Sequence, residues 1–263
     1  MLFLPKHLIM KQYIPNALTL LNLLCGCIAV IFAVDANFIW ASFLVFIGIF
    51  FDFFDGFAAR KLNVQSELGL QLDSLADVVT SGLVPGIVMY KLLELSDLEM
   101  FQQIGVFQQW TETLAWAGIK IAILPLFGLS ITLASAYRLA KFNIDTEQQS
   151  FFKGLPTPAN ALLIISLPLI LKFQDNDAIN EIILNKWFLI GITIFSCWIL
   201  TSNVKLFALK FKTYGFKTNA TRYIFIILCL VLLIVLQFAA IPLIILLYIG
   251  MSVLDNMTSK ELK

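Results

Sequence analysis

Four aspartates stand in an otherwise largely apolar stretch of the chain: Asp52, Asp55, Asp73 and Asp77. The first two are three residues apart and the last two are four apart, so on helices each pair would share one face. The short connection formed by residues 61–68 would make the two helices antiparallel neighbours, with the pairs facing each other. Facing carboxylates repel unless cations lie between them, and their oxygens favour Mg²⁺, Mn²⁺ or Ca²⁺ over Zn²⁺. The spacing therefore predicts a two-metal site that binds a pyrophosphate and polarises its phosphorus.

Small and basic residues beside these acids suit a phosphate-bearing ligand. Gly56 and Ala59 remove side-chain bulk on the helix face of the first acid pair, which lets a ligand approach the backbone. Arg60 follows at the helix end and is able to fork onto phosphate oxygens. Gly69 opens the next helix and allows close helix packing. We expect these residues to border a ligand next to the acids.

The elements that must position these residues are membrane helices. Of the 263 residues, 60% are apolar and 13% are charged, whereas about 25% of the residues in a soluble domain are charged. A transmembrane helix needs about 20 mostly apolar residues. The stretches that qualify are about 15–34, 38–60, 69–93, 116–140, 157–173, 186–202, 221–238 and 240–255. We therefore expect an all-α, polytopic transmembrane bundle of about eight spans, with a kink in the third span near Gly82, Pro85 and Gly86.

The distribution of basic residues orients this bundle. With the N-terminus inside, 14 of the 18 lysines and arginines lie in inside segments and 4 lie in outside segments. The positive-inside rule then predicts cytoplasmic termini and a cytoplasmic active site. The membrane itself is expected to be a bacterial inner membrane.

The spans and the charge pattern divide the chain into five parts. Residues 1–13 and 203–217 mix apolar and basic side chains, which is typical of amphipathic helices in the headgroup layer. The expected parts are an interfacial segment (1–13), a six-span core (14–202), a basic amphipathic segment (203–220), a transmembrane hairpin (221–255) and a polar tail (256–263). The hairpin has an alternative, a single helix broken near Pro242.

Two residue types are set aside as sources of chemistry. The four cysteines lie inside apolar runs without metal-ligand spacing, so they are interpreted as small buried hydrophobes. The only histidine, His7, belongs to the N-terminal segment, which leaves no histidine-based catalytic scheme. The net charge of +1 gives no indication of a nucleic-acid partner.

The acid-rich segment is similar to a family signature. It reads Asp52-x2-Asp55-Gly56-x2-Ala59-Arg60-x8-Gly69-x3-Asp73-x3-Asp77, and this pattern resembles that of the CDP-alcohol phosphotransferases. The resemblance implies cleavage of the pyrophosphate of a CDP-linked donor, transfer of its phosphoryl-bearing part to an alcohol, and release of CMP. It also implies that the four aspartates bind two divalent cations, Mg²⁺ or Mn²⁺, that Asp77 is in addition the general base, and that the protein is a homodimer.

The same resemblance implies a set of donor contacts. Pro15 and Asn16, at the mouth of the first helix, match a nucleotide contact of the family. Gly56, Arg60 and Ser66 match positions that contact the nucleotide and its phosphates. With Ala59 and Gly69 of the signature, these residues form the expected binding site for the CDP donor.

The acceptor is indicated by other segments. Residues 14–33, 135–143 and 152–159, and the two spans beyond the six usual for the family, resemble phosphatidylserine synthases, which implies CDP-diacylglycerol and L-serine as substrates. Arg138 would clamp the carboxylate of serine bidentately, and Lys153 and Asn143, in the same cytoplasmic loop, would complete the pocket. Asn22, a polar residue inside the first span, is expected to face the site or to form a helix-packing hydrogen bond.

Three alternatives stay open at this point. A sibling enzyme would use glycerol 3-phosphate or an inositol phosphate, although such dianionic acceptors favour more basic residues beside the acids. An aspartate-rich intramembrane prenyltransferase would place its acidic clusters far apart in sequence. A cation transporter or channel would spread its acids across the membrane depth.

Overall fold

The fold is described by a computed structural model that covers residues 6–104, 123–144, 152–174, 176–206 and 216–261. In chain order the helical elements are α1 (Lys6–Val34), α2 (Phe38–Leu62), α3 (Glu67–Asp77), the π-helical η1 (Val78–Leu83), α4 (Val84–Ile104), α5 (Ile123–Leu126), the 3₁₀ turn η3 (Phe127–Leu129), α6 (Ser130–Ile144), α7 (Thr157–Phe173), α8 (Asp177–Ile183), α9 (Lys186–Thr201), α10 (Phe216–Leu236), the 3₁₀ turn η4 (Gln237–Ala239) and α11 (Ala240–Glu261). The strands β1 (Phe152–Lys153) and β2 (Lys205–Leu206) pair antiparallel.

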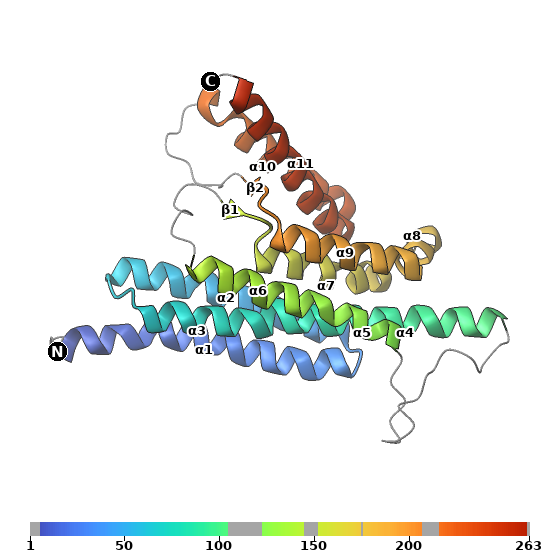
Figure 1. The fold of residues 1–263 in the computed structure, drawn as a ribbon, viewed down its shortest axis with the longest axis horizontal. Coiled ribbons are helices and arrows are strands. Elements are labelled where there is room, and N and C mark those ends of the chain that lie inside the picture. Colours follow the sequence, from blue (N-terminus) through green and yellow to red (C-terminus); the bar gives the residue numbers. More distant parts are fainter. Residues whose placement is uncertain (1–5, 105–122, 145–151, 175, 207–215, 262–263) are drawn as a thin grey trace.

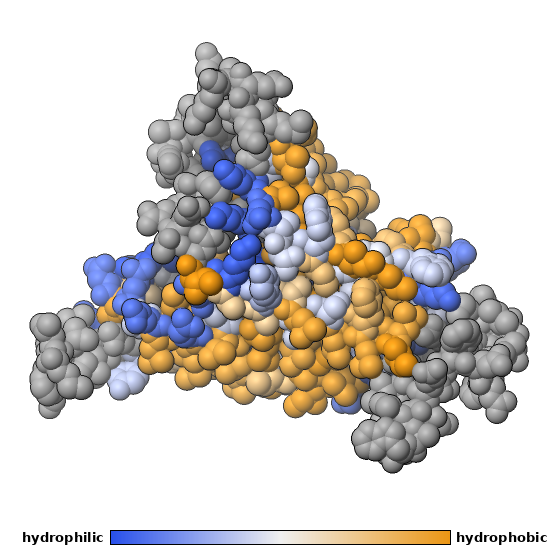
Figure 2. Space-filling view, viewed as in Figure 1, coloured by the Kyte–Doolittle hydropathy of each residue, from blue (hydrophilic) through white to orange (hydrophobic). Residues whose placement is uncertain are grey.

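The chain is an all-α membrane protein, as the sequence predicts. Within the described residues five helical stretches are long and apolar enough to cross a membrane: Tyr13–Val34, Phe38–Leu62, Glu67–Ser96, Ile123–Ile144 and Arg222–Leu254. The bent pair α8 and α9, with 60° between its helices, makes a sixth if it counts as one span. Helix α7 is apolar but shorter, so length and composition support five or six spans where the sequence suggested about eight. This count takes Arg222–Leu254 as one stretch, although it contains α10, η4 and α11. On the face seen in Figure 2, apolar residues cover the helix bundle and hydrophilic residues gather toward one end.

The two C-terminal helices form a hairpin. The rings of Phe225 in α10 and Tyr248 in α11 have centroids 5.8 Å apart, although a straight helix would separate them by about 34 Å at 1.5 Å per residue. The chain reverses at η4, where Gln237 adopts a φ of 48°, and Figure 1 shows α11 running back along α10. The break precedes Pro242, which lies in the first turn of α11, where proline is tolerated.

The two predicted interfacial segments differ in their secondary structure. From Lys6 onward the N-terminal segment is helical and continuous with α1, whose candidate span begins at Tyr13, and its interfacial position stays a prediction. The helix predicted over 203–217 is wrong at its start, because Lys205 and Leu206 form β2 and pair with β1. Residues 207–215 lie outside the described part of the chain.

The helices that carry the acids pack closely against α1. The side-chain amide of Asn22 donates to Asp77, and the Thr80 hydroxyl donates to the backbone oxygen of Asn22 over 3.1 Å. Gly26 also lies against Thr80, so α1 and the α3–η1 unit run in the same direction (Figure 1). The opposite face of α3–η1 meets α6 in the antiparallel sense, since Ser74 bonds to Asn143 and Gly82 contacts Ser135.

A wide helical turn follows Asp77 directly. The residues Val78–Leu83 form the π-helical η1. The sequence predicted a kink near Gly82, Pro85 and Gly86, whereas the stretch Glu67–Ser96 forms one continuous span. Pro85 has no backbone N–H to donate to the preceding turn, so the regular α-helical bonding is interrupted there. The turn is therefore a local consequence of the sequence. It places Thr80 against α1, where the Thr80 hydroxyl donates to the Asn22 backbone oxygen.

Replacement of Gly26 by alanine is expected to destabilise the protein by about 1–3 kcal/mol and to lower its activity. A Cβ at this position would lie 2.3 Å from Oγ1 of Thr80 and 3.0 Å from its Cα, so the backbone of η1 would have to move. Thermal unfolding of the purified variant in detergent measures the loss. Gly191→Ala is the matched control, because nothing lies within 4 Å of its Cβ position. Equal unfolding temperatures for the two variants would contradict the close packing of α1 against η1.

Candidate active site

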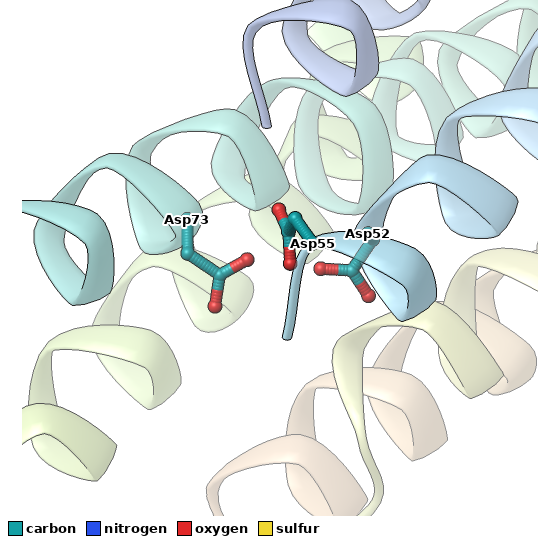
Figure 3. Close-up of side chains that lie close together, drawn as sticks. All are labelled: Asp52, Asp55 and Asp73. Carbon is teal, nitrogen blue, oxygen red and sulfur yellow. The ribbon is translucent and has the colours of Figure 1, made fainter. Parts of the chain in front are cut away.

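Three of the predicted acids meet at one point between two helices. Asp52 and Asp55 come from α2 and Asp73 comes from α3, and one carboxylate oxygen of each lies within 4.8 Å of the others. Figure 3 shows Asp52 and Asp73 pointing toward each other with Asp55 between them. The convergence expected from the helical spacing and the short connection is therefore present for these residues.

This acid cluster, Asp52, Asp55 and Asp73, has the features of a cation site. The Oδ1 atom of Asp73 is buried and has no hydrogen-bond partner. Within the described residues, no lysine or arginine forms a salt bridge with any of the acids in the cluster. Clustered carboxylates in a poorly solvated site are unfavourable unless a positive charge compensates them. The three carboxylates thus fit a divalent cation that prefers oxygen ligands.

Asp77 lies beside the acid cluster but is not part of it. Its side chain is buried, and its Oδ1 accepts a hydrogen bond of 3.3 Å from Nδ2 of Asn22. Asp77 therefore lies next to the group of three and interacts electrostatically with each of its members. Asn22 faces the site, which was one of its two predicted positions.

Thr19 is a site residue that the sequence analysis missed. Its hydroxyl is 2.5 Å from Oδ2 of Asp55 and 3.1 Å from the backbone oxygen of Pro15. Thr19 and Asn22 are three residues apart, so they share one face of α1. Two polar residues at helical spacing in an apolar helix were the available signal.

A cavity of about 460 Å³ opens next to the acid cluster, between α1, α2 and the start of α3. Asp55 and Asp73 form part of its wall. Its lining includes every residue predicted to contact the donor: Pro15, Asn16, Gly56, Ala59, Arg60, Ser66 and Gly69. The structure thus brings all of these residues together around one space.

Two glycines at the wall of this cavity, Gly56 and Gly69, leave space beside the backbone, as the sequence predicts. A Cβ on Gly56 would lie 3.2 Å from Nη1 of Arg60, so the guanidinium group lies close to the bare backbone. A Cβ on Gly69 would lie 3.2 Å from Oγ of Ser66. The Gly69 N–H donates to this Oγ atom over 3.1 Å, so Ser66 is the N-cap of α3. A helix N-terminus at a cavity wall favours an anion.

The predicted acceptor residues separate into two groups. Arg138 and Lys153 line a second, smaller cavity at the end of α9, together with Lys141. Arg138 is buried, its Nε has no hydrogen-bond partner, and it interacts electrostatically with Asp77. Asn143 instead bonds to Ser74 over 3.0 Å, so it links α6 to α3 one residue after Asp73.

The position of Lys153 is fixed by a tight backbone connection. Lys153 belongs to β1, and the next residue, Gly154, adopts a φ of 72° and donates its N–H to the Val204 oxygen over 2.8 Å. A Cβ on Gly154 would lie 2.8 Å from the backbone oxygen of Leu200. Only glycine fits both this conformation and this spacing, so the loop is held against the end of α9.

Comparison with protein families shows the family to which the chain belongs. Residues 12–199 match the family model described as CDP-alcohol phosphatidyltransferase. The chain belongs to this family. The match includes the acid cluster, Asp77 and the larger cavity, and part of the smaller one. Leu200, Thr201 and Ser202 of the smaller cavity lie beyond it, as do α10 and α11. Membership in the CDP-alcohol phosphatidyltransferase family sets aside the prenyltransferase and cation-transporter alternatives.

Several curated members of the family are similar to this chain. The CDP-diacylglycerol–serine O-phosphatidyltransferase of Bacillus subtilis is 34% identical over 171 residues, which are 65% of this chain and 81% of that protein. The protein of the same name from Helicobacter pylori (strain J99) is 31% identical over 153 residues, 57% of this chain and 55% of the relative. The one from Methanocaldococcus jannaschii is 32% identical over 153 residues, 58% of each chain. The chain thus spans little more than half the length of the last two relatives.

Proposed function

We propose that this protein transfers the phosphatidyl group of CDP-diacylglycerol to the hydroxyl of L-serine, with release of CMP. The observation that supports this most directly is the cavity beside the acid cluster. All the residues expected to contact a CDP donor line this cavity. The relatives that carry the serine transferase name support the choice of acceptor.

The larger cavity is the proposed donor site. Its volume of about 460 Å³ suits a nucleotide and its phosphates. Arg60 and the N-terminus of α3 supply positive charge for the pyrophosphate, and Gly56 leaves space for it. The acid cluster would hold divalent cations, Mg²⁺ or Mn²⁺, against the same group. The acyl chains of the donor would remain among lipids beside the apolar helices.

The proposed reaction is a single displacement at phosphorus. When bound, the cations would neutralise the pyrophosphate and polarise the phosphorus under attack. The serine hydroxyl gives its proton to Asp77, and its oxygen forms a bond to the phosphorus that carries diacylglycerol. The bond from that phosphorus to the CMP oxygen breaks, and CMP leaves with the electron pair. The residues of this chain orient the donor, accept the proton and exclude water.

Arg138 and Lys153 are the proposed partners of the serine carboxylate. Both line the smaller cavity, whose volume of about 20 Å³ must widen to admit serine. Arg138 interacts electrostatically with Asp77, the proposed acceptor of the hydroxyl proton. The third predicted acceptor residue, Asn143, bonds to α3 rather than lining this cavity. Its proposed role is therefore to hold α6, which carries Arg138, at a fixed position relative to Asp77.

Replacement of Arg138 by glutamine is expected to raise the KM for serine roughly tenfold to a hundredfold, because a charge-assisted hydrogen bond contributes about 1.5–3 kcal/mol. The KM for CDP-diacylglycerol should change much less. Initial rates of CMP release at varied serine concentration measure the effect, with the exposed Lys172→Gln as the control. If only the KM for CDP-diacylglycerol rises, Arg138 contacts the donor and not serine.

The acceptor assay tests the proposal as a whole. Purified protein is incubated with CDP-diacylglycerol, Mn²⁺ or Mg²⁺, and either serine, glycerol 3-phosphate or inositol 1-phosphate, and CMP release is followed. Serine alone should support rapid release. Faster release with either phosphorylated alcohol would identify a sibling enzyme of the same family, and no release with any alcohol would refute the proposed reaction.

The proposal includes the setting of the enzyme. We place the acid cluster and both termini on the cytoplasmic side of a bacterial inner membrane, because most basic residues then lie inside. The predicted division into a core of residues 14–202, flanking segments and a C-terminal hairpin belongs to this proposal, as does a homodimer. Cross-linking in native membranes would test the dimer, and accessibility of cysteines placed near each terminus would test the orientation.

A further inference from the structure

The hydrogen bond between Asn22 and Asp77 lies deep in the bundle. Asn22 is 0% exposed and Asp77 is 7% exposed. The amide Nδ2 donates to Oδ1 of Asp77 over 3.3 Å. The opposite orientation of the amide would place its oxygen against a carboxylate oxygen, which is repulsive, so the chemistry fixes which atom faces Asp77.

Asn22 is held in place from two other sides. Its backbone oxygen accepts the hydroxyl of Thr80, from the π-helical turn that follows Asp77. Its Oδ1 lies over Gly48 of α2, where an added Cβ would be only 2.8 Å away. The amide therefore has little freedom to turn away from Asp77.

One polar atom of Asn22 is unsatisfied, because its Oδ1 is buried and has no hydrogen-bond partner. An apolar side chain of similar shape would avoid that cost, but it would leave Oδ1 of the buried Asp77 without its donor. The bond to Asp77 is thus the feature that distinguishes asparagine from leucine at this position.

The two polar residues of this face of α1 contact different acids. Thr19 donates to Asp55, a member of the acid cluster. Asn22 donates to Asp77, which is outside the cluster. One face of α1 therefore donates a separate hydrogen bond to Asp55 of the acid cluster and to Asp77.

We infer that Asn22 is a positioning residue that fixes the orientation of Asp77 beside the acid cluster and leaves one oxygen of Asp77 for the hydroxyl of the acceptor. Because Oδ1 accepts the amide hydrogen, Oδ2 is the oxygen that remains to take the proton. This inference rests on the proposed function, in which Asp77 is the proton acceptor. It concerns the division of labour among the acids and applies to any acceptor alcohol.

The test replaces Asn22 by leucine, which keeps the branched shape and removes the hydrogen bond, and by alanine, in case leucine does not fit. For both variants kcat should fall about tenfold to a hundredfold, because a misplaced base loses part of the rate that general-base catalysis supplies. The KM values for donor and acceptor, and Mn²⁺ affinity measured by the shift in unfolding temperature, should stay within about twofold of the wild type. The unfolding temperature without metal should fall modestly for the leucine variant, because Oδ1 of the buried Asp77 loses its donor.

Two further variants make the result specific. Thr19→Val should weaken Mn²⁺ affinity several-fold, since Thr19 holds an acid of the cluster. Ser42→Ala is the control, since it removes a buried hydroxyl that has no hydrogen-bond partner and lies far along α2 from the acids. It should leave kcat and Mn²⁺ affinity unchanged.

The inference is overturned if the Asn22 variants keep wild-type kcat, or if their kcat falls only together with Mn²⁺ affinity, as it would after general loosening of the site. Rates are measured with whichever alcohol supports CMP release by the wild type. Inactivity of the wild type toward serine would therefore refute the proposed acceptor and not the role of Asn22.

Discussion

Asp77→Asn should lower turnover by a factor of about 10²–10⁴, the usual contribution of a general base. The amide cannot accept the hydroxyl proton, whereas the buried position and the neighbouring Asn22 tolerate a side chain of the same shape. Donor binding should largely persist, because Asp77 does not line the larger cavity and is not a member of the acid cluster. CMP release under saturating substrates measures turnover, and protection of the folded state by CDP-diacylglycerol measures binding.

Asp35→Asn is the matched control for this experiment. Asp35 is an exposed aspartate in the turn between α1 and α2, away from the site, and the control variant should keep wild-type turnover. Normal turnover of Asp77→Asn would rule out Asp77 as the base. Loss of both turnover and donor binding would instead indicate that Asp77 shares in holding the donor.

Asp73→Asn should have the second large effect, a strong loss of activity at low Mn²⁺ that a high Mn²⁺ concentration partly restores. Asp73 points at the other acids of the cluster and has a buried oxygen without a partner, so its substitution removes a ligand from the cation site. The Mn²⁺ concentration that gives half-maximal CMP release should rise by at least tenfold. Chelation of divalent cations should abolish the wild-type activity, and addition of Mn²⁺ should restore it.

The same variant makes a prediction of opposite sign for stability. Without metal, the acid cluster brings like charges together in a poorly solvated place, so replacement of one carboxylate by an amide should raise the unfolding temperature. With Mn²⁺, the wild type should gain more stability than the variant. A metal-free variant that unfolds at a lower temperature than the wild type would argue against charge repulsion within the cluster.

The convergence of the acids was predictable because local geometry dictates it, whereas Pro15, Asn16 and Ser66 were expected at the donor cavity from the family resemblance. Residues three and four apart on a helix share a face, so each acid pair had to point one way. The short connection after α2 left the two helices no arrangement except antiparallel neighbours. The same reasoning placed Gly56 and Arg60 beside the acids, and the structure brings both to the wall of the larger cavity.

Other features depend on how distant helices meet. The rotation of α1 about its own axis decides that Thr19 faces Asp55 and that Asn22 faces Asp77, and this rotation is set by the close approach of Thr80 to Gly26. Asn143 illustrates the same dependence. It shares a loop region with Lys153 in sequence, yet it bonds to Ser74 on α3 because of the antiparallel register of α6.

The amino-acid sequence by itself therefore determined the membrane class, the helical nature of the fold and the residues that form the acid cluster, since these follow from composition and helical periodicity. The resemblance to the family added the remaining residues of the donor cavity. Only the tertiary structure decided which acid stands apart, which polar residue of α1 serves it, and that the C-terminal helices form a hairpin. Those outcomes depend on contacts between side chains far apart in the chain, such as Phe225 with Tyr248, and no local pattern encodes them.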